Sequence, residues 1–292
     1  MTSKMCIYHG NCADGFGAAY AVWKWDSQVE FFPGVYQQEA PDVTGKDVIL
    51  VDFCYKLDVI ETLAKQARTI TILDHHKSAA EDLDVYAHPA PDNVLALTFD
   101  EFANYASTVG VPNIRSFFDM ERSGAMIAWN FFHPDTQPPL LIEHIQDRDL
   151  WRFALPGTRE IQACVFSYPY DFQVWDFLMS LDIEELRKDG ESIERKHFRD
   201  IAELLQVTTV RMTIGGFDVP VANLPYTMAS DAAHQLAQGE LFAACYWDTP
   251  AGRVFGLRST KDGMDVQAIA RQYGGGGHVH AAGFTLVPGA TL

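Results

Sequence analysis

Histidine and aspartate side chains follow three short apolar runs in the first quarter of the chain. The runs and the residues that follow them are 5–8 with His9, 48–51 with Asp52, and 70–73 with Asp74-His75-His76. Imidazole nitrogens and carboxylate oxygens are common ligands of divalent cations. If these segments meet in the fold, their side chains can hold metal, so the sequence favours an enzyme.

The three apolar runs are typical of buried strands in a parallel sheet, because helix-type stretches separate them. Small and apolar residues at 15–25 indicate one helix, and apolar residues at helical spacing over 57–67 indicate another. Residues 29–32, closed by Pro33-Gly34, supply a further strand. Ligands of such sheets gather at the carboxyl ends of the strands, which is where the histidines and aspartates lie.

A run of four glycines, 274–277, is followed by His278 and then by the core-type segment 281–284. Glycine lets backbone N–H groups approach an anion closely, because it has no Cβ. A flexible linker is the alternative, but the flanking residues are not serine, proline or charged. Arg258 and Ser259, which end another strand pattern, add a guanidinium and a hydroxyl suited to phosphate.

Length, charge and cysteine content limit the function classes. The chain has 292 residues, more than a usual single domain, and a formal net charge of -17. This charge disfavours wrapping of long nucleic acid, although short phosphate ligands need only a local basic pocket. Because the five cysteines form no CxxC pair and neither a signal peptide nor a membrane span is apparent, we expect a cytoplasmic protein without disulfides.

The later part of the chain changes in character. Helical patterns cover 100–145 and 171–205, and a polar stretch over 182–199 is suited to bridging two domains. Four strand patterns follow at 208–214, 217–222, 241–247 and 253–257, with helical stretches near 228–237 and 266–273. We therefore predict an α/β chain with a catalytic domain over 1–170, a helical linker over 171–206 and a smaller domain over 207–292.

Taken together, the motifs resemble the DHH phosphoesterases with an attached DHHA1 domain. The resemblance runs from Ile7 to Phe284 and includes the Asp-His-His motif, the upstream Asp14-Gly15 pair, and the glycine run with His278. It implies a parallel-sheet DHH domain with a helical extension, a smaller α/β DHHA1 domain and a cleft between them. It also implies manganese-dependent hydrolysis of phosphoester bonds. The members that this chain resembles are the small oligoribonucleases, which act like 3′–5′ exonucleases, and the cyclic-dinucleotide phosphodiesterases.

The resemblance also assigns roles to individual residues. It implies two manganese ions whose ligands are His9, Asp14, Asp52, His75 and Asp147, where Asp147 is preferred over Asp149 and Asp52 is shared. Two such ions, roughly 3.5–4 Å apart, can lower the pKa of water and neutralise developing charge. His76 would face the scissile phosphate, and Asp74 would orient its neighbours. The substrate-binding candidates are Arg258, Ser259, Gly275, Gly276, Gly277 and His278.

One position departs from the family pattern. The family usually has an aspartate two residues before the Asp-Gly aspartate, where this chain has Cys12 with Asn11 beside it. A Cys12 thiolate would favour a softer metal such as zinc or iron, whereas an Asn11 carbonyl oxygen or a water would be a neutral substitute. We expect a weakened first site that still holds manganese, with magnesium, cobalt and zinc as alternative ions.

The main functional prediction is a metal-dependent phosphodiesterase that acts on short oligonucleotides or dinucleotides and releases nucleoside monophosphates. One alternative is a phosphomonoesterase acting on 3′-phosphoadenosine 5′-phosphate. Another, raised by Cys12, is a nucleotide-binding regulator that kept the fold but lost turnover. The substrate is the expected partner, membrane association is not expected, and a homodimer is left open.

Overall fold

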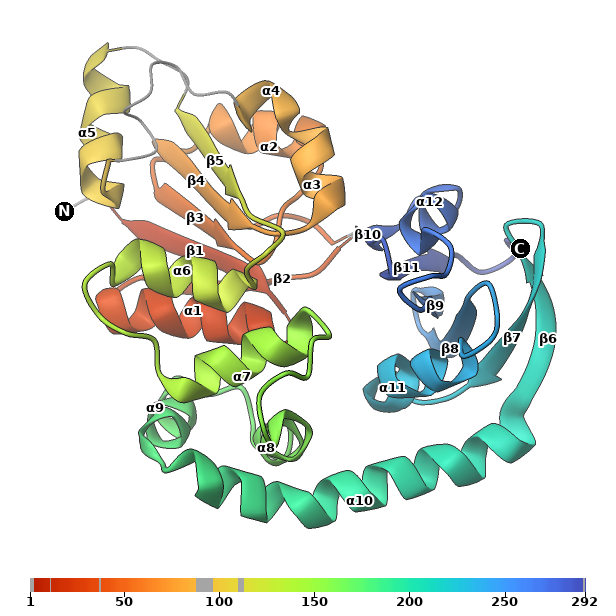
Figure 1. Ribbon diagram of the computed structural model, residues 1–292. Coiled ribbons are helices and arrows are strands. Elements are labelled where there is room, and N and C mark those ends of the chain that lie inside the picture. Colours follow the sequence, from red (N-terminus) through yellow and green to blue (C-terminus); the bar gives the residue numbers. More distant parts are fainter. Residues whose placement is uncertain (1–2, 11, 37, 88–96, 110–112, 291) are drawn as a thin grey trace. The chain divides into compact units, whose positions relative to one another are not determined.

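The computed structural model describes residues 3–10, 12–36, 38–87, 97–109, 113–290 and 292. The chain divides into two compact units, residues 1–194 and 195–292, called unit 1 and unit 2 below. Their boundary falls inside the long helix α10 (Ile183–Thr208). The stretch predicted as a separate linker is therefore shared between the two units. Each unit is built around its own sheet (Figure 1).

The sheet of unit 1 has five strands, all parallel, in the order β2-β1-β3-β4-β5. The strands are β1 (Lys4–His9), β2 (Glu30–Gly34), β3 (Asp47–Val51), β4 (Thr69–Asp74) and β5 (Ile114–Phe118). The first four confirm strands that the apolar runs predicted. Strand order reverses at β1, because the next strand along the chain lies on one side of it and the strand after that on the other.

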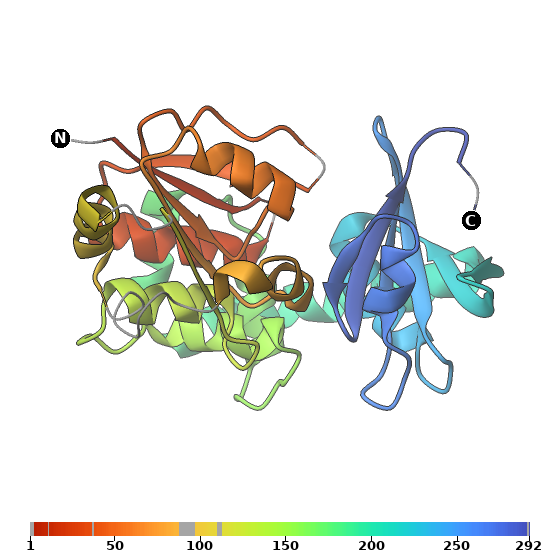
Figure 2. The ribbon, with the colours of Figure 1, turned by 90° about the horizontal axis from the view of Figure 1, so that it is seen from above.

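Helices cover both faces of this sheet (Figures 1 and 2). On one face, α1 (Ala13–Trp25) and α6 (Gly124–Phe132) share a hydrophobic core with Leu73. On the other face, α2 (Leu57–Ala64) shares a core with Ile72, the neighbouring residue of the same strand. Successive strand residues thus serve opposite cores, which is why these strands appear in the sequence as continuous apolar runs.

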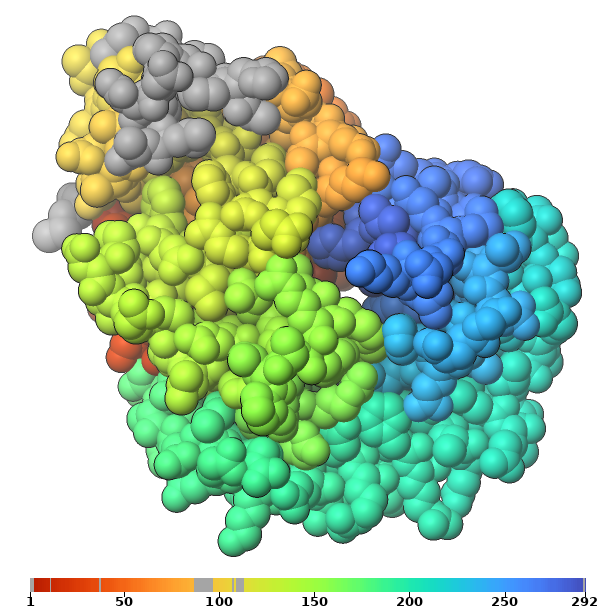
Figure 3. All heavy atoms as spheres, in the orientation of Figure 1, coloured from red at the N-terminus to blue at the C-terminus, as the bar shows by residue number. Residues whose placement is uncertain are grey.

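Several of the later helices of unit 1 bring buried residues into the core that α1 and α6 share. The later helices are α3 (Lys77–Asp82), α4 (Asp84–Ala87), α5 (Phe99–Val109), α7 (Leu140–Asp149), α8 (Thr158–Val165) and α9 (Phe172–Ser180). In the space-filling view, yellow to green segments form most of the visible surface of unit 1, and the red amino-terminal segments are largely covered (Figure 3). Among the helices of the described residues, none combines the length and the apolar character that a membrane crossing requires.

Strand β5 corrects the prediction that residues 100–145 are helical throughout. Its residues pair in parallel with β4. Arg115 interrupts the apolar run, so the strand signal was weak in the sequence. In the structure Arg115 is only 4% exposed, and its guanidinium donates hydrogen bonds to Thr71 Oγ1 and to the carbonyl oxygen of Leu97. Hydrogen bonds to distant segments therefore compensate the cost of burying this charged side chain in the sheet.

Unit 2 is built on a six-stranded mixed sheet in the order β10-β11-β9-β8-β7-β6. Its strands are β6 (Thr209–Ile214), β7 (Phe217–Asn223), β8 (Ala243–Thr249), β9 (Gly252–Arg258), β10 (Gly276–His278) and β11 (Ala281–Leu286). On one face, α11 (Tyr226–Leu236) packs together with the last turns of α10, and on the other α12 (Val266–Arg271) packs on the sheet. The first four strands confirm predicted ones, whereas β10 and β11 were not predicted.

Candidate metal centre

The carboxyl ends of β1 and β3 are neighbours at the point where the strand order of unit 1 reverses. Tyr8 pairs with Val51 in their register, so His9 and Asp52 come next on the two strands. Open α/β sheets bind ligands outside this point, because the connections leave to opposite faces and open a crevice there. His9 Nδ1 lies 3.5 Å from Asp52 Oδ2. Two of the predicted ligands are thus side by side.

Asp52 is held in an unusual backbone conformation. Its φ is +52°, in the left-handed region, which costs of order 1 kcal/mol for a residue with a Cβ. Its amide donates to the carbonyl oxygen of Leu73 at 3.0 Å. Gly124, the first residue of α6, faces the side chain, and a Cβ at that position would lie only 2.4 Å from the Cβ of Asp52. Sequence reasoning did not single out Gly124, although its lack of a Cβ lets α6 approach this carboxylate.

Asp14 is fixed by the N-terminus of α6. Its Oδ2 accepts from the amide of Gly124 at 2.6 Å, and its Oδ1 accepts from the amide of Ala125 at 3.0 Å. A helix N-terminus favours negative charge, since its amides have no partner within the helix. The adjacent Gly15 lets α1 pass close to β1, because a Cβ there would lie 2.3 Å from the carbonyl oxygen of His9. The Asp-Gly pair therefore has a packing reason.

His75 lies at the centre of the carboxylates and is only 1% exposed. Its Nε2 lies 3.0 Å from Asp52 Oδ1, 3.6 Å from Asp14 Oδ2 and 3.5 Å from Asp149 Oδ2. One ring nitrogen carries one proton or one lone pair, so it cannot form good hydrogen bonds to three carboxylates at once. Oxygen and nitrogen donors that converge in this way are typical of ligands around a divalent cation.

Asp74 organises the two histidines that follow it. It is fully buried, and its Oδ1 accepts hydrogen bonds from the backbone amides of His75 at 2.7 Å and His76 at 3.3 Å. The same oxygen lies 2.7 Å from His76 Nδ1. A carboxylate at one ring nitrogen fixes the orientation of an imidazole and the tautomer it adopts. This geometry agrees with the orienting role that the family resemblance gives to Asp74.

The structure brings Asp149, and not the predicted Asp147, into the cluster around His75. Asp147 accepts hydrogen bonds from two backbone amides of the loop after α7 and, at 2.6 Å, from the hydroxyl of Thr158. Both of its oxygens are used to hold that loop, and Asp149 instead reaches His75. Helical spacing contained the signal, since Asp149 comes four residues after the buried Ile145 and so shares its face of α7.

Burial and repulsion between carboxylates shape the charges of the cluster. Burial, together with the charges of Asp52 and Asp149, raises the pKa of Asp14 well above its usual range. Burial likewise raises the pKa of Asp149, against the opposing charge of His75. Burial also acts to raise the pKa of Asp52, but its hydrogen bond with His75, its interaction with His9 and the charges of His75 and His76 outweigh it and hold that pKa well below the usual range.

The imidazoles and the thiol respond to the same carboxylates. Burial acts to lower the pKa of His75, but the charges of Asp149 and Asp52 outweigh it and raise that pKa well above the usual value. The pKa of His9 is also raised, because Asp52 outweighs the effect of burial. Burial and the nearby carboxylates raise the pKa of the Cys12 thiol well above its usual value. The cluster therefore holds protons that a bound cation would displace.

Two groups of candidate ligand atoms meet at Asp52. The His9 group is His9, Cys12 and Asp52, and the His75 group is Asp14, His75 and Asp149; within each group the atoms lie within 4.8 Å of one another. Asp52 Oδ2 faces the first group and Asp52 Oδ1 faces His75 of the second. Asn11, the other candidate at the departing position, lies outside the described residues.

Some buried polar atoms of both groups have no hydrogen-bond partner among the described residues. Within the part of the chain that the structure describes, Asp52 Oδ2, Asp149 Oδ2 and His9 Nδ1 are buried and have no hydrogen-bond partner. Such atoms cost free energy of about 1–3 kcal/mol each, and more when charged. A cation between them would supply the missing interaction. The residues present therefore fit divalent metal.

In unit 2, strand register brings two of the predicted substrate-binding residues into one row. His278 pairs with Ala281, and Ala281 pairs with Arg258 on the next strand. Directly paired residues share a face of a sheet, and two strand spacings separate the outer ones by about 10 Å. Arg258 donates to Ser230 Oγ, which steadies the guanidinium. Only a methyl group stands between the arginine and the histidine along this row.

The other predicted substrate-binding residues have structural contacts instead. Ser259 is 3% exposed, and its hydroxyl donates to the carbonyl oxygen of Met264 while His280 Nδ1 lies 2.9 Å away. A Cβ at Gly275 would lie 2.0 Å from the carbonyl oxygen of Gly283, so this glycine is required for packing. Gly276 and Gly277 form β10 and pair with β11. The structure therefore places the predicted substrate-binding residue Ser259 in the interior of unit 2 and not beside Arg258 in the row.

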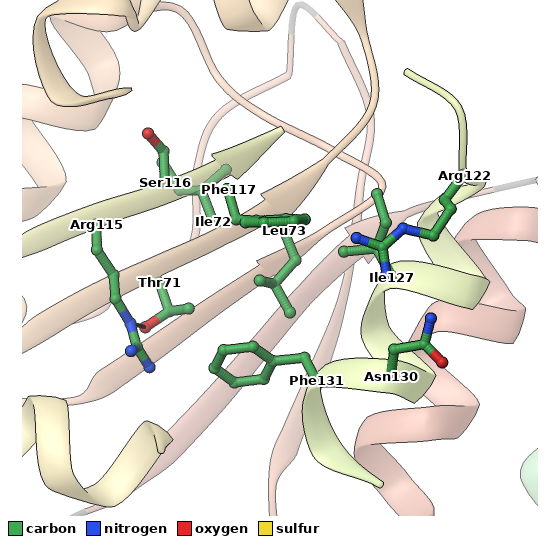
Figure 4. A pocket seen from close by; sticks show the side chains of 10 residues that line it. All are labelled: Thr71, Ile72, Leu73, Arg115, Ser116, Phe117, Arg122, Ile127, Asn130 and Phe131. Atoms are coloured by element: carbon green, nitrogen blue, oxygen red, sulfur yellow. Dashed lines mark hydrogen bonds between the residues drawn. The ribbon is translucent and has the colours of Figure 1, made fainter. Parts of the chain in front are cut away.

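A separate cavity of about 200 Å³ lies between α6 and the strands β4 and β5. Figure 4 shows Arg115 and Thr71 at one end of it and Arg122 and Asn130 at the other. Among the described residues that line it there is no histidine, cysteine or carboxylate. The cavity is therefore distinct from the two groups around Asp52.

No family model matches the chain. An uncharacterized protein of Acanthamoeba polyphaga mimivirus, R106, is 28% identical over 310 residues, which cover 96% of this chain and 66% of the relative's length. The chain thus spans about two thirds of the length of that curated relative.

Similar solved structures include three bacterial proteins. A pGpG-specific phosphodiesterase from Vibrio cholerae has 13% identity and a TM-score of 0.46, covering 98% of this chain and 94% of that one. An exopolyphosphatase-related protein from Bacteroides fragilis has 13% identity and a TM-score of 0.42, covering 100% and 88%. An uncharacterized protein from Helicobacter pylori has 14% identity and a TM-score of 0.41, covering 100% and 95%. Matches at this level assign no function to the chain.

Proposed function

We propose that the chain is a metal-dependent phosphodiesterase that hydrolyses short oligonucleotides or dinucleotides to nucleoside monophosphates. The placement of Asp52 carries this proposal, because its two oxygens face His75 and His9 and so connect two groups of ligand atoms. Paired cations are a recurring arrangement in phosphatases and nucleases. The order and spacing of the sequence motifs, which resemble those of the DHH phosphoesterases, support the same activity.

The metal would be held by residues whose chemistry suits hard or borderline ions. In the His75 group the donors are two carboxylates and one imidazole, a set that favours manganese, with magnesium and cobalt as substitutes. When bound, divalent cations lower the pKa of water and neutralise negative charge on a phosphate. Asp52 would then balance the charge of both groups, since it is the carboxylate that stays ionised most readily.

His76 would act on the phosphate directly. Its Nδ1 is fixed by Asp74, so the opposite side of the ring presents Nε2. Nε2 would donate a hydrogen bond to a phosphate oxygen when the ring is protonated, or accept a proton when it is neutral. Because Asp74 is fully buried, water does not compete for its hydrogen bond with the His76 ring, and the ring orientation is kept.

Unit 2 would supply the anion-binding row. A guanidinium pairs with phosphate oxygens through parallel hydrogen bonds, and Arg258 already has its direction set by Ser230. His278 lies on the same face of the sheet as Arg258, and the small residue between them leaves space for a ligand. The proposal therefore assigns substrate binding to Arg258 and His278 but not to Ser259.

The test is hydrolysis by the purified protein with manganese. Substrates are short RNA and DNA oligonucleotides, pApA, pGpG, cyclic dinucleotides and 3′-phosphoadenosine 5′-phosphate, with products separated by chromatography. We expect release of mononucleotides from the oligonucleotides or dinucleotides, lost on chelation and restored by manganese. Release of inorganic phosphate from 3′-phosphoadenosine 5′-phosphate alone would replace the proposal with a phosphomonoesterase. Dinucleotide binding without any cleavage would replace it with a regulator.

A further inference from the structure

We propose that the Cys12 thiolate is a metal ligand and that the two groups around Asp52 therefore bind unlike metals. The His9 group would take a softer ion such as zinc, and the His75 group would take manganese. This inference rests on the proposed metal centre and gives it an asymmetry that the proposed activity does not require.

The position of Cys12 on the helix gives the first argument. Cys12 is the N-cap residue of α1, with an extended backbone (φ −129°, ψ 136°), and its side chain forms no capping hydrogen bond. Serine, threonine, asparagine and aspartate are the residues that stabilise this position as caps. The sulfur instead lies within 4.8 Å of the ligand atoms of His9 and Asp52. The sulfur thus lies among the candidate ligand atoms of the His9 group.

The atoms around the sulfur give a second, independent argument. Asp52 is only 1% exposed, and its Oδ2 has no hydrogen-bond partner among the residues that the structure describes. The same holds for the buried Nδ1 of His9, which faces that oxygen at 3.5 Å. One thiolate, one imidazole nitrogen and one carboxylate oxygen make three protein ligands. Catalytic zinc sites commonly have three protein ligands and one open position.

The surroundings of the other cysteines differ from those of Cys12. All five cysteines are described, and Cys12 is the only one that is not buried. Cys6 in β1 and Cys164 in α8 lie in the core that α1 and α6 share, and Cys245 lies in the core under α11. Those three serve as small apolar residues. Cys12 is surrounded by carboxylates and imidazole, so its role is different.

The donor types then set the metals. Thiolate sulfur is a soft ligand that selects zinc, cobalt or iron over manganese and magnesium. The His75 group has only oxygen and nitrogen donors, which suit manganese. The two groups share Asp52 but differ in their other donors. Loss of Cys12 should therefore change the metal affinity of the His9 group more than that of the His75 group.

Cobalt tests this directly, because a thiolate bound to Co²⁺ gives an intense charge-transfer band in the near ultraviolet. The chelator-treated full chain is titrated with Co²⁺ under reducing conditions, and bound cobalt is counted by equilibrium dialysis. We expect the band in the natural chain and in the control variant Cys164→Ser. Cys164 is also a free cysteine, but it is buried in a core away from the metal-ligand groups. We expect no band in Cys12→Ser.

A second variant separates the ligand role from folding. Cys12→Asp keeps an anionic donor, so it should still bind cobalt in both groups but without the band. Its zinc affinity should fall by at least about tenfold, whereas its manganese affinity should stay equal or rise. Circular dichroism of both variants should match that of the natural chain.

The outcomes separate this inference from the proposed activity. Cobalt bound to the natural chain without the band, no cobalt bound at all, or an equal band in Cys12→Ser would each overturn the thiolate assignment. Manganese-stimulated cleavage without the band would leave the proposed function standing and remove the asymmetry. Observation of the band without cleavage of any substrate would support the Cys12 ligand and contradict the proposed function.

Discussion

The metal centre of unit 1 and the anion-binding row of unit 2 differ in how their polar groups are satisfied. In unit 1, buried oxygens of Asp52 and Asp149 have no hydrogen-bond partner among the described residues, and Asp52 adopts a left-handed backbone. In unit 2, the Arg258 guanidinium donates hydrogen bonds to Ser230 Oγ and to the carbonyl oxygen of Leu257. A cation would satisfy the buried oxygens of unit 1, whereas Arg258 of unit 2 already has protein partners.

Glycines show the same contrast. Gly124 protects a functional side chain, because a Cβ there would strike Asp52. Gly275 protects a strand pairing, because a Cβ there would strike the carbonyl oxygen of Gly283. Loss of a group in unit 1 should therefore remove function abruptly, and loss of a group in unit 2 should reduce binding or stability by degrees.

The sharpest test of this contrast is Asp52→Asn. An amide lacks the negative charge that balances both groups, so we expect manganese affinity and hydrolysis to fall by at least about 100-fold. Calorimetry with manganese and the hydrolysis rate measure the two effects. The control is Asp47→Asn, a carboxylate at the start of the same strand that is equally buried and bonds to Arg68 and Thr69. It should lower thermal stability and leave manganese binding unchanged, and equal losses in both variants would contradict the role of Asp52.

The paired variants Gly124→Ala and Gly275→Ala test the glycine contrast. Gly124→Ala should displace the Asp52 carboxylate and reduce manganese affinity by about 10–100-fold, with a smaller change in melting temperature. Gly275→Ala should lower the melting temperature and leave the manganese affinity as it is. Calorimetry and thermal unfolding of both proteins give the four values. If the two variants behaved alike, the division between the units would be wrong.

The pH dependence of metal binding follows from the raised pKa of His75. The raised pKa favours the protonated ring in the cation-free cluster, and Nε2 must lose that proton before it can bind metal. Manganese affinity should therefore rise with pH, by about tenfold per pH unit for each proton displaced, until the pKa is passed. Calorimetry over a pH series measures the slope. His234→Gln, in α11 of unit 2, should keep the slope, and His75→Gln should reduce it; a slope of zero in the natural chain would contradict the proton competition.

The smallest effect is expected from Arg258→Ala. Charge-assisted hydrogen bonds contribute about 1.5–3 kcal/mol, so KM for a dinucleotide should rise by roughly tenfold or more while kcat changes little. The control is Arg253→Ala at the other end of the same strand, where the guanidinium pairs with Asp248 on the surface. Steady-state kinetics of both variants decide the matter. A fall in kcat with KM unchanged would place Arg258 in the chemistry and not in binding.

The sequence alone predicted most residues of the candidate metal centre, because the signals were local. Each of the three apolar runs is a strand, and His9, Asp52 and His75 are placed by the ends of those strands. Parallel strands have their carboxyl ends at one edge of the sheet, so residues far apart in the chain were bound to meet there. The departure at Cys12 was also visible, since it depends on spacing alone.

Tertiary structure decided what depends on contacts between distant segments. Asp14 and Gly124 are 110 residues apart, and their hydrogen bond sets both the carboxylate and the approach of α6 to Asp52. The position of Asp149 beside His75 depended on how α7 packs against α1 and α6, and the burial of Ser259 depended on Met264 and His280. Sequence patterns report periodicity and residue type, whereas these choices depend on which atoms of separate elements come within a few ångströms of one another.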